Sequence, residues 1–243
     1  MNKFVRYTVD KLVVDENDKK LSSGFKINNK KEEDVILIFG INPAGYEEAA
    51  QYNKENNLYL CYAGGSNLAS LVNNNYYSGI YKFASIITNN SVKLEWCNQD
   101  FRQLEPKMSN LTPKQLKAVK KFYDEHKDNR YTIYLGDLFY YHTTKFKEFK
   151  PLIKPMTSAE KYDYAMKMLK LHIEELKKHN KNIKFIYINN AEATAYFQNN
   201  KVKTFEYVDG IPVFYGGMLT GQHAMDKTST LRLVNEIKNK VKL

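Results

Sequence analysis

The stretch that decides the fold is Asp34-Val-Ile-Leu-Ile-Phe-Gly-Ile-Asn-Pro-Ala-Gly45. Its apolar run is unbroken, stops at Gly40 and turns through Asn42-Pro43. A run without polar alternation that ends in turn residues is typical of a strand buried on both faces of a parallel sheet. The loop after such a strand lies at the carboxyl end of the sheet, where open α/β sheets bind ligands. A second interpretation stays open, in which these residues only turn the chain.

Three further segments have the form of buried strands. They are Tyr131 to Leu135, Ile183 to Ile188 and Ile211 to Tyr215, and each is followed by Gly or Asn. Helical patterns and capping signals fall in residues 77–84, 113–125, 158–178, 191–197 and 231–241. This alternation predicts an α/β fold with a four-stranded, largely parallel sheet between helical layers. The loops after the strands should gather along one edge of that sheet.

Length and composition favour one α/β domain over residues 1–243. The chain has 243 residues, 43% of them hydrophobic, which is enough to bury one substantial core. Residues 1–33 are polar and rich in Lys, Asn and Asp. We expect them to form an N-terminal extension packed on the domain.

The chain is basic. Lys and Arg number 37 against 27 acidic residues, a formal charge of +10. Such an excess favours a polyanionic partner such as nucleic acid or an acidic surface. The Lys residues are scattered, however, so a biased composition with ordinary solvated surfaces is the alternative explanation.

Cysteine usage and hydropathy bear on the cellular setting. Cys61 and Cys97 are the only cysteines, too few for a disulfide framework or a four-cysteine cluster. The first residues lack the apolar core of a signal peptide, and no run approaches the roughly 20 apolar residues that span a bilayer. We therefore expect a cytoplasmic protein with no membrane partner. The sequence does not predict an oligomeric state.

Motifs for common cofactors, and for a serine nucleophile, are missing from the sequence. No strand is followed by a Walker or dinucleotide-type glycine loop, no zinc-ligand spacing occurs among the five His and two Cys, and no G-x-S-x-G elbow is present. We expect neither a metal nor an organic cofactor.

The motif Gly40-Ile41-Asn42-Pro43 resembles the uracil-DNA glycosylase superfamily, in particular its mismatch-specific, thymine-DNA-glycosylase-like branch, in which a first strand ends in Gly-Ile-Asn-Pro. The segment Asn73 to Tyr77 is similar to the Asn-Arg-Phe-Trp stretch of that family. The order of strands extends the resemblance over residues 34–243. The chain thus resembles a divergent member of the superfamily. This resemblance implies a uracil-DNA-glycosylase-like fold and a role in base excision repair.

The resemblance implies roles for single residues. Asn42 would hold the water that attacks the anomeric carbon of a flipped nucleotide, because its carbonyl can orient water although it cannot take the proton. Tyr76 or Tyr77 would stack on the extruded base, which is worth roughly 1–3 kcal/mol. Packing in the core or on the surface is the alternative for both tyrosines. The other residues expected to line the substrate pocket are Gly40, Ile41, Pro43 and Asn189.

One departure from the family pattern lies after the second predicted strand. The family has an Asn there that reads the uracil edge, whereas this chain has Gly136-Asp137. An ionised Asp only accepts hydrogen bonds, so it would suit a partner with two adjacent donors, such as a guanine-like edge. Alternatively, Asp137 caps the next segment.

The other departure follows the fourth predicted strand. The family's His-Pro-Ser is replaced by Gly216-Gly-Met-Leu-Thr-Gly-Gln-His223. His223 would stabilise the negative charge on the departing base, and Gly217, Met218, Leu219 and Gln222 would form a loop that contacts DNA. The alternatives are phosphate contacts for Gln222 and His223, or a helix-entry loop, and a buried hydrophobic staple for Met218-Leu219. The sequence therefore favours two functions: hydrolysis of an N-glycosidic bond, or a catalytically silent module that binds nucleic acid or a nucleotide.

Overall fold

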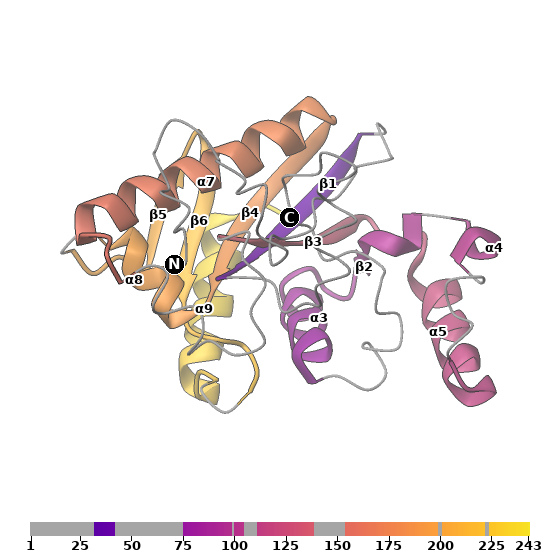
Figure 1. The fold of residues 1–243 in the computed structure, drawn as a ribbon. Coiled ribbons are helices and arrows are strands. Elements are labelled where there is room, and N and C mark those ends of the chain that lie inside the picture. The colour runs from indigo at the N-terminus through magenta and orange to yellow at the C-terminus, as the bar shows by residue number, and fades with distance from the viewer. Residues whose placement is uncertain are drawn as a thin grey trace, which may run out of the picture.

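The structure is a computed structural model of the chain. It describes residues 32–41, 75–98, 100–104, 111–138, 154–198, 201–221 and 224–243. Figure 1 shows a twisted sheet with helices on both sides. Of the predicted N-terminal extension, residues 1–33, only the last two positions fall within the described residues, and Glu33 already begins the first strand.

Six strands of the described chain form one sheet in the order β2-β3-β1-β4-β6-β5 (Figure 1). They are β1 (Glu33–Gly40), β2 (Val92–Leu94), β3 (Tyr131–Asp137), β4 (Lys181–Asn189), β5 (Phe205–Val208) and β6 (Ile211–Gly216). All neighbours run parallel except β5, which pairs antiparallel with β6. The prediction of an α/β fold with a largely parallel sheet is confirmed.

The four predicted strands are β1, β3, β4 and β6, and they lie next to one another as the centre of the sheet. The sheet is wider than predicted, because β2 and β5 extend it at its two edges. β2 has 3 residues and β5 has 4, fewer than the roughly 5–6 of an average strand. Runs this short give no recognisable periodicity.

β1 occupies the middle of the sheet, between β3 and β4. The side chains from Val35 to Phe39 are at most 1% exposed, and they alternate between two hydrophobic clusters. A central parallel strand has helices on both faces, so every position is apolar. This burial explains the unbroken run in the sequence.

The described helices cover both faces of the sheet. They are α3 (Asn75–Ile87), the 3₁₀ turn η1 (Glu95–Asn98), α4 (Phe101–Leu104), α5 (Pro113–His126), α7 (Ser158–Lys178), α8 (Ala191–Phe197) and α9 (Lys227–Lys240). α3, α5 and α9 contribute to one hydrophobic cluster, and α7 and α8 to the other. In Figure 1, α7 runs along one side of the sheet, and α3 and α9 lie on the other.

Local capping signals fix the starts of the helices. Thr112 and Thr157 both form complete capping boxes, as predicted, with Gln115 and Glu160. Asn190 caps α8 by accepting from the main-chain N–H groups of the second and third residues of the helix. The caps hold each helix start close to the sheet.

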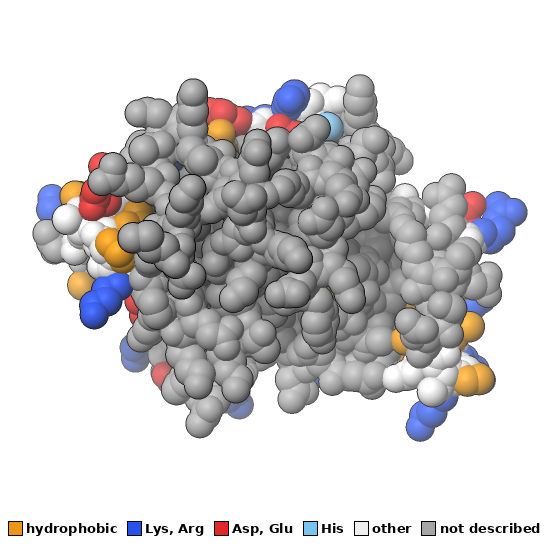
Figure 2. Space-filling view, viewed as in Figure 1, with side chains coloured by type: hydrophobic (Ala, Val, Ile, Leu, Met, Phe, Trp, Pro, Cys, Tyr) orange, Lys and Arg blue, Asp and Glu red, His pale blue; other side chains and the backbone are white. Residues whose placement is uncertain are grey.

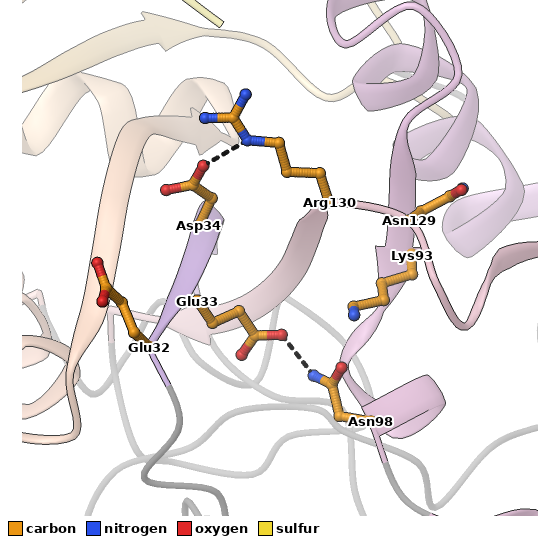
Figure 3. Close-up of a pocket in the computed structure, with 7 residues that line it drawn as sticks. All are labelled: Glu32, Glu33, Asp34, Lys93, Asn98, Asn129 and Arg130. Atoms are coloured by element: carbon orange, nitrogen blue, oxygen red, sulfur yellow. Dashed lines mark hydrogen bonds and ion pairs between the residues drawn. The ribbon is translucent and has the colours of Figure 1, made fainter.

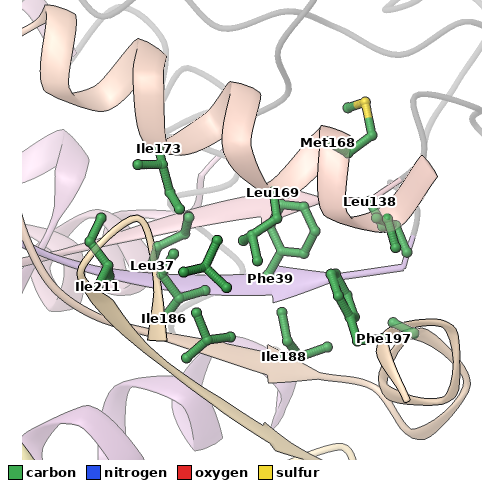
Figure 4. Close-up of a cluster of buried hydrophobic side chains, with 14 of the residues drawn as sticks. Leu37, Phe39, Leu138, Met168, Leu169, Ile173, Ile186, Ile188, Phe197 and Ile211 are labelled. Carbon is green, nitrogen blue, oxygen red and sulfur yellow. The ribbon is translucent and has the colours of Figure 1, made fainter. Parts of the chain in front are cut away.

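The cluster on the α7 side is shown in Figure 4. Leu37 and Phe39 of β1 pack there against Leu169 and Ile173 of α7. Each large aliphatic or aromatic side chain buried in this way stabilises the fold by about 1.5–3 kcal/mol. The cluster fixes α7, and with it the connection from β3 to β4.

The chain changes direction at β1. From β1 it passes through α3, β2 and α5 to reach β3, and from β3 it passes through α7 to β4 on the other side of β1. After β1 the chain goes on to β2 and β3, which lie on one side of β1 in the sheet. After β4 it goes on to β5 and β6, which lie on the other side. A crevice outside the carboxyl ends is expected at such a switch point.

Candidate functional site at the carboxyl edge of the sheet

Four residues form one row at the carboxyl ends of the central strands. Gly40 of β1 pairs in register with Asp137 of β3, and Asn189 of β4 pairs with Gly216 of β6. Phe39 pairs with Ile188, so Gly40 and Asn189 follow at the next step. The row Asp137–Gly40–Asn189–Gly216 therefore crosses four adjacent strands.

All four positions of the row face the same side. The residues two positions earlier on each strand, Ile38, Leu135, Tyr187 and Phe214, all belong to the cluster beneath α3 and α9. Because side chains alternate along a strand, the row faces that side too. At both of its glycines, a side chain of a neighbouring residue fills the place of the missing Cβ atom: Asp137 at Gly40, and Tyr187 at Gly216.

Gly40 lies directly beneath the carboxyl group of Asp137. A Cβ atom at Gly40 would lie 2.5 Å from Asp137 Oδ1, closer than real Cβ contacts allow. The main-chain N–H of Leu138 donates to the carbonyl of Gly40 at 3.0 Å, which joins the exits of the two strands. Glycine is thus the residue that lets the Asp137 carboxyl lie over the end of β1.

The carboxyl group of Asp137 has no hydrogen bond or ion pair with any described residue. It keeps some exposure to solvent, yet desolvation by the surrounding protein raises the pKa of Asp137 to about 7. Near neutral pH, the group is therefore a mixture of carboxylic acid and carboxylate. From the sequence, a fully ionised Asp is expected instead. As for its alternative role as a cap, no main-chain N–H of the described residues donates to the Asp137 carboxyl.

His172 of α7 supports Asp137 from the other face and was not predicted. Its Nε2–H donates to the main-chain carbonyl of Asp137 at 3.2 Å, and its ring meets Phe39 edge-on at 4.8 Å. His172 is fully buried, and desolvation lowers its pKa to about 3, against the smaller opposite effect of the hydrogen bond to Asp137. The imidazole is therefore neutral at ordinary pH, and it fixes the backbone at the end of β3.

Asn189 fixes the loop after β6. Its Oδ1 accepts from the main-chain N–H of Leu219 at 2.9 Å. The hydroxyl of Tyr187 donates to the carbonyl of Gly217, and that of Thr194 donates to the carbonyl of Gly216 at 2.8 Å. The candidate DNA-contact residues Gly217 and Leu219 thus belong to a loop held against the end of β4.

The same loop contacts α3. A Cβ atom at Gly79 of α3 would lie 1.8 Å from Thr220 Cγ2, so the helix and the loop touch at this glycine. Leu219 packs against the cluster beneath α3 and α9, and Met218 is partly buried. Both Met218 and Leu219 therefore keep part of their surface exposed, and a DNA wedge and a hydrophobic staple stay open as predictions.

The structure brings seven of the predicted site residues to this edge. They are Gly40, Ile41, Asp137, Asn189, Gly217, Met218 and Leu219. Asn42, Pro43, Gln222 and His223 lie outside the described residues. Tyr76 and Tyr77 belong to the first turn of α3, but their side chains are not described. The roles given to all thirteen site residues remain predictions.

A polar pocket lies at the opposite, amino edge of the sheet and was not predicted. Its cavity of about 400 Å³ is lined by Glu32, Glu33, Asp34, Lys93, Asn98, Asn129 and Arg130 (Figure 3). Arg130 Nε lies 2.8 Å from Asp34 Oδ2, and Asn98 Nδ2 donates to Glu33 Oε1 at 2.6 Å. The carboxylates of Glu33 and Asp34 are therefore engaged by other protein groups.

Comparisons with known proteins add no family. The chain matches no protein-family model, no curated protein and no solved structure. Within the described residues, no helix is both long and apolar enough to cross a bilayer. The same residues contain no group of three His, Cys, Asp or Glu side chains that could hold a metal ion.

Proposed function

We propose that this chain binds a nucleobase at the carboxyl edge of its sheet and hydrolyses the N-glycosidic bond of a flipped base in DNA, as a divergent relative of uracil-DNA glycosylases. The observation that supports the proposal is the row Asp137–Gly40–Asn189–Gly216. This row lies at the switch point of the sheet, where α/β proteins bind ligands. Its Gly40 ends β1 and is the first residue of the Gly-Ile-Asn-Pro motif that carries the family resemblance.

The proposed reaction needs little more than positioning. Asn42 follows Ile41 at the end of β1, and its side-chain carbonyl would orient a water molecule towards the anomeric carbon. The bond from carbon to the base nitrogen breaks, and the base leaves with the electron pair. The water oxygen bonds to the anomeric carbon and loses one proton, which balances the negative charge of the departing base. His223 would stabilise that charge before it is neutralised.

The net charge of +10 fits a nucleic-acid partner. In the view of Figure 2, the described Lys and Arg side chains lie at separate points around the outline of the molecule. Phosphate contacts release counterions, so binding to a labelled strand should weaken steeply with added salt. A flat salt response would indicate that the charge reflects composition only.

A catalytically silent module that binds nucleic acid or a nucleotide is the second candidate. Two features favour it: Asp137 stands where the family has Asn, and the loop with Gly217 and Leu219 replaces His-Pro-Ser. Such a module would retain the row at the carboxyl edge and bind the same strands without cutting them.

A base-excision assay tests the proposal. Labelled duplexes and single strands that carry uracil, hypoxanthine, xanthine or a mismatched thymine are incubated with the protein, and abasic sites are then cleaved with alkali. We expect cutting of at least one substrate by the natural chain and none by Asn42→Ala. Asn235→Ala, which changes an exposed Asn of α9, is the matched control and should cut normally. Binding without cutting would instead establish the silent module.

A further inference from the structure

We propose that Asp137 recognises the base as a neutral carboxylic acid, and that the ligand therefore presents an N–H group beside a carbonyl oxygen. Uracil, thymine and hypoxanthine share this lactam edge, whereas cytosine does not have it. The inference rests on the proposed function, because it assigns a specificity-determining residue to the same site.

The Asp137 carboxyl lies at the carboxyl edge of the sheet. Its carboxyl lies over Gly40, with Oδ1 2.5 Å from the place where a Cβ atom would stand, and Gly40 adds no side chain of its own. Asn189, the next side chain in the row, stands two strands away at roughly 10 Å between α-carbons. The carboxyl therefore lies in the place that a side chain at position 40 would otherwise occupy.

A second observation concerns the partners of this carboxyl. No described residue donates a hydrogen bond to the Asp137 carboxyl or forms an ion pair with it. A polar group in a protein interior that the fold does not satisfy is a candidate for satisfaction by a ligand. Other carboxylates of the sheet, such as Glu33 and Asp34, are satisfied by protein groups.

The surrounding groups favour the neutral form. β1 and β4 present Gly40 and Asn189, which carry no charge, and α7 presents His172, which is neutral and bonds the main-chain carbonyl of Asp137. No described Lys or Arg pairs with the carboxyl. Among the described groups nothing offsets desolvation, which raises the pKa of Asp137 to about 7.

The hydrogen-bonding groups of a neutral carboxylic acid indicate the class of ligand. A carboxylic acid donates through its O–H and accepts through its C=O, so it forms two parallel hydrogen bonds with a lactam edge. A carboxylate can only accept, and it would suit the two adjacent donors of guanine. Guanine also has a lactam edge, N1–H beside O6. A neutral Asp137 would therefore accept uracil-like bases and guanine, whereas the carboxylate would accept guanine but not uracil.

A titration with nucleosides tests the inference. Deoxyuridine, 3-methyldeoxyuridine, which lacks the N–H, and deoxyguanosine are each added to the full chain, and binding is followed by NMR. We expect deoxyuridine to bind in preference to its 3-methyl analogue, and to weaken about tenfold between about pH 6 and about pH 8 as the acid ionises. Asp137→Asn, whose amide also donates and accepts, should keep the preference and lose the pH dependence.

Two results would overturn the inference while leaving glycosylase activity intact. They are equal binding of deoxyuridine and its 3-methyl analogue, and an unchanged pH dependence in Asp137→Asn. The converse is also distinguishable. Selective, pH-dependent binding of deoxyuridine by a chain that neither binds nor cuts any DNA strand would support the reading of Asp137 and overturn the proposed function.

Discussion

The side-chain carboxyl groups at the two edges of the central sheet differ in their protein partners. At the amino edge, Glu33 accepts hydrogen bonds from Asn98 and Thr132, and Lys181 Nζ lies 3.1 Å from its Oε2. At the carboxyl edge, Asp137 has no such partner among the described residues. The same type of side chain is thus part of the scaffold at one end of the sheet and remains available at the other.

The pKa values follow this difference. Burial acts to raise the pKa of Asp34 at the amino edge, but hydrogen bonds from Arg130 and Asn182 and the charge of Lys184 outweigh it, so that its pKa is lowered. Desolvation raises the pKa of Asp137 to about 7, and no described group offsets it. Protein partners, and not burial alone, determine which carboxyl can change its charge near neutral pH.

The largest effect is expected from breaking the buried pair at the amino edge. The side chain of Lys181 is 0% exposed and that of Glu33 is 7% exposed. Lys181→Met leaves the Glu33 carboxylate buried without its counter-charge, so urea denaturation should show a loss of about 3–5 kcal/mol in the free energy of unfolding. Adding Glu33→Gln to Lys181→Met should restore part of the loss.

The matched control for this pair is Lys184→Met. Its Nζ lies 3.6 Å from Asp34, which keeps Arg130 and Asn182 as partners. The loss should stay below about 1 kcal/mol, as for other partly exposed pairs. If both lysine variants lose equally little, the amino edge is not held together by its buried charge pair.

A change of intermediate size is expected at Asp137, with the opposite sign. Its pKa is about 7 in the folded chain against an ordinary value of 3.8, so ionisation penalises the folded state increasingly from about pH 4 to about pH 7 and constantly above. Asp137→Asn removes this penalty, and should raise the free energy of unfolding at about pH 8 by up to about 4 kcal/mol. The gain should vanish towards about pH 4.

Asp34→Asn is the counterpart at the amino edge. The lowered pKa of Asp34 means that its carboxylate stabilises the folded chain above the ordinary value of 3.8, and that this stabilisation is lost in stronger acid. Asp34→Asn should therefore destabilise the chain at neutral pH, where Asp137→Asn stabilises it. Changes of the same sign in the two variants would contradict the contrast between the edges.

The sequence predicts the elements better than it predicts these contacts. The central strands and the capping boxes of Thr112 and Thr157 are local patterns, and they were confirmed. The network at the amino edge joins residues far apart in the chain, such as Asn182 and Asp34, which are 148 positions apart. No local pattern marks such a contact, and Glu33 itself was assigned to the N-terminal extension.

The carboxyl edge shows the same limit. Turn residues after buried strands predicted where Gly40, Asp137 and Asn189 would meet, because parallel strands end at one edge. The protonation of Asp137 depends on desolvation by the folded chain, which no motif encodes. His172 was missed because it falls among the apolar residues of α7 that face the sheet, where a single polar residue gives no separate signal.

The effect expected from His172 is small per pH unit. Its pKa of about 3 lies below the ordinary value of 6.5, so the unfolded chain binds more protons between these values and stability falls on acidification. Asp137 opposes this change between about pH 4 and about pH 7. In Asp137→Asn, the loss should therefore appear, at about 1 kcal/mol per pH unit. Adding His172→Gln should make the free energy of unfolding nearly independent of pH across this range, as measured by chemical denaturation. An unchanged dependence on pH would show that other groups cause the acid sensitivity.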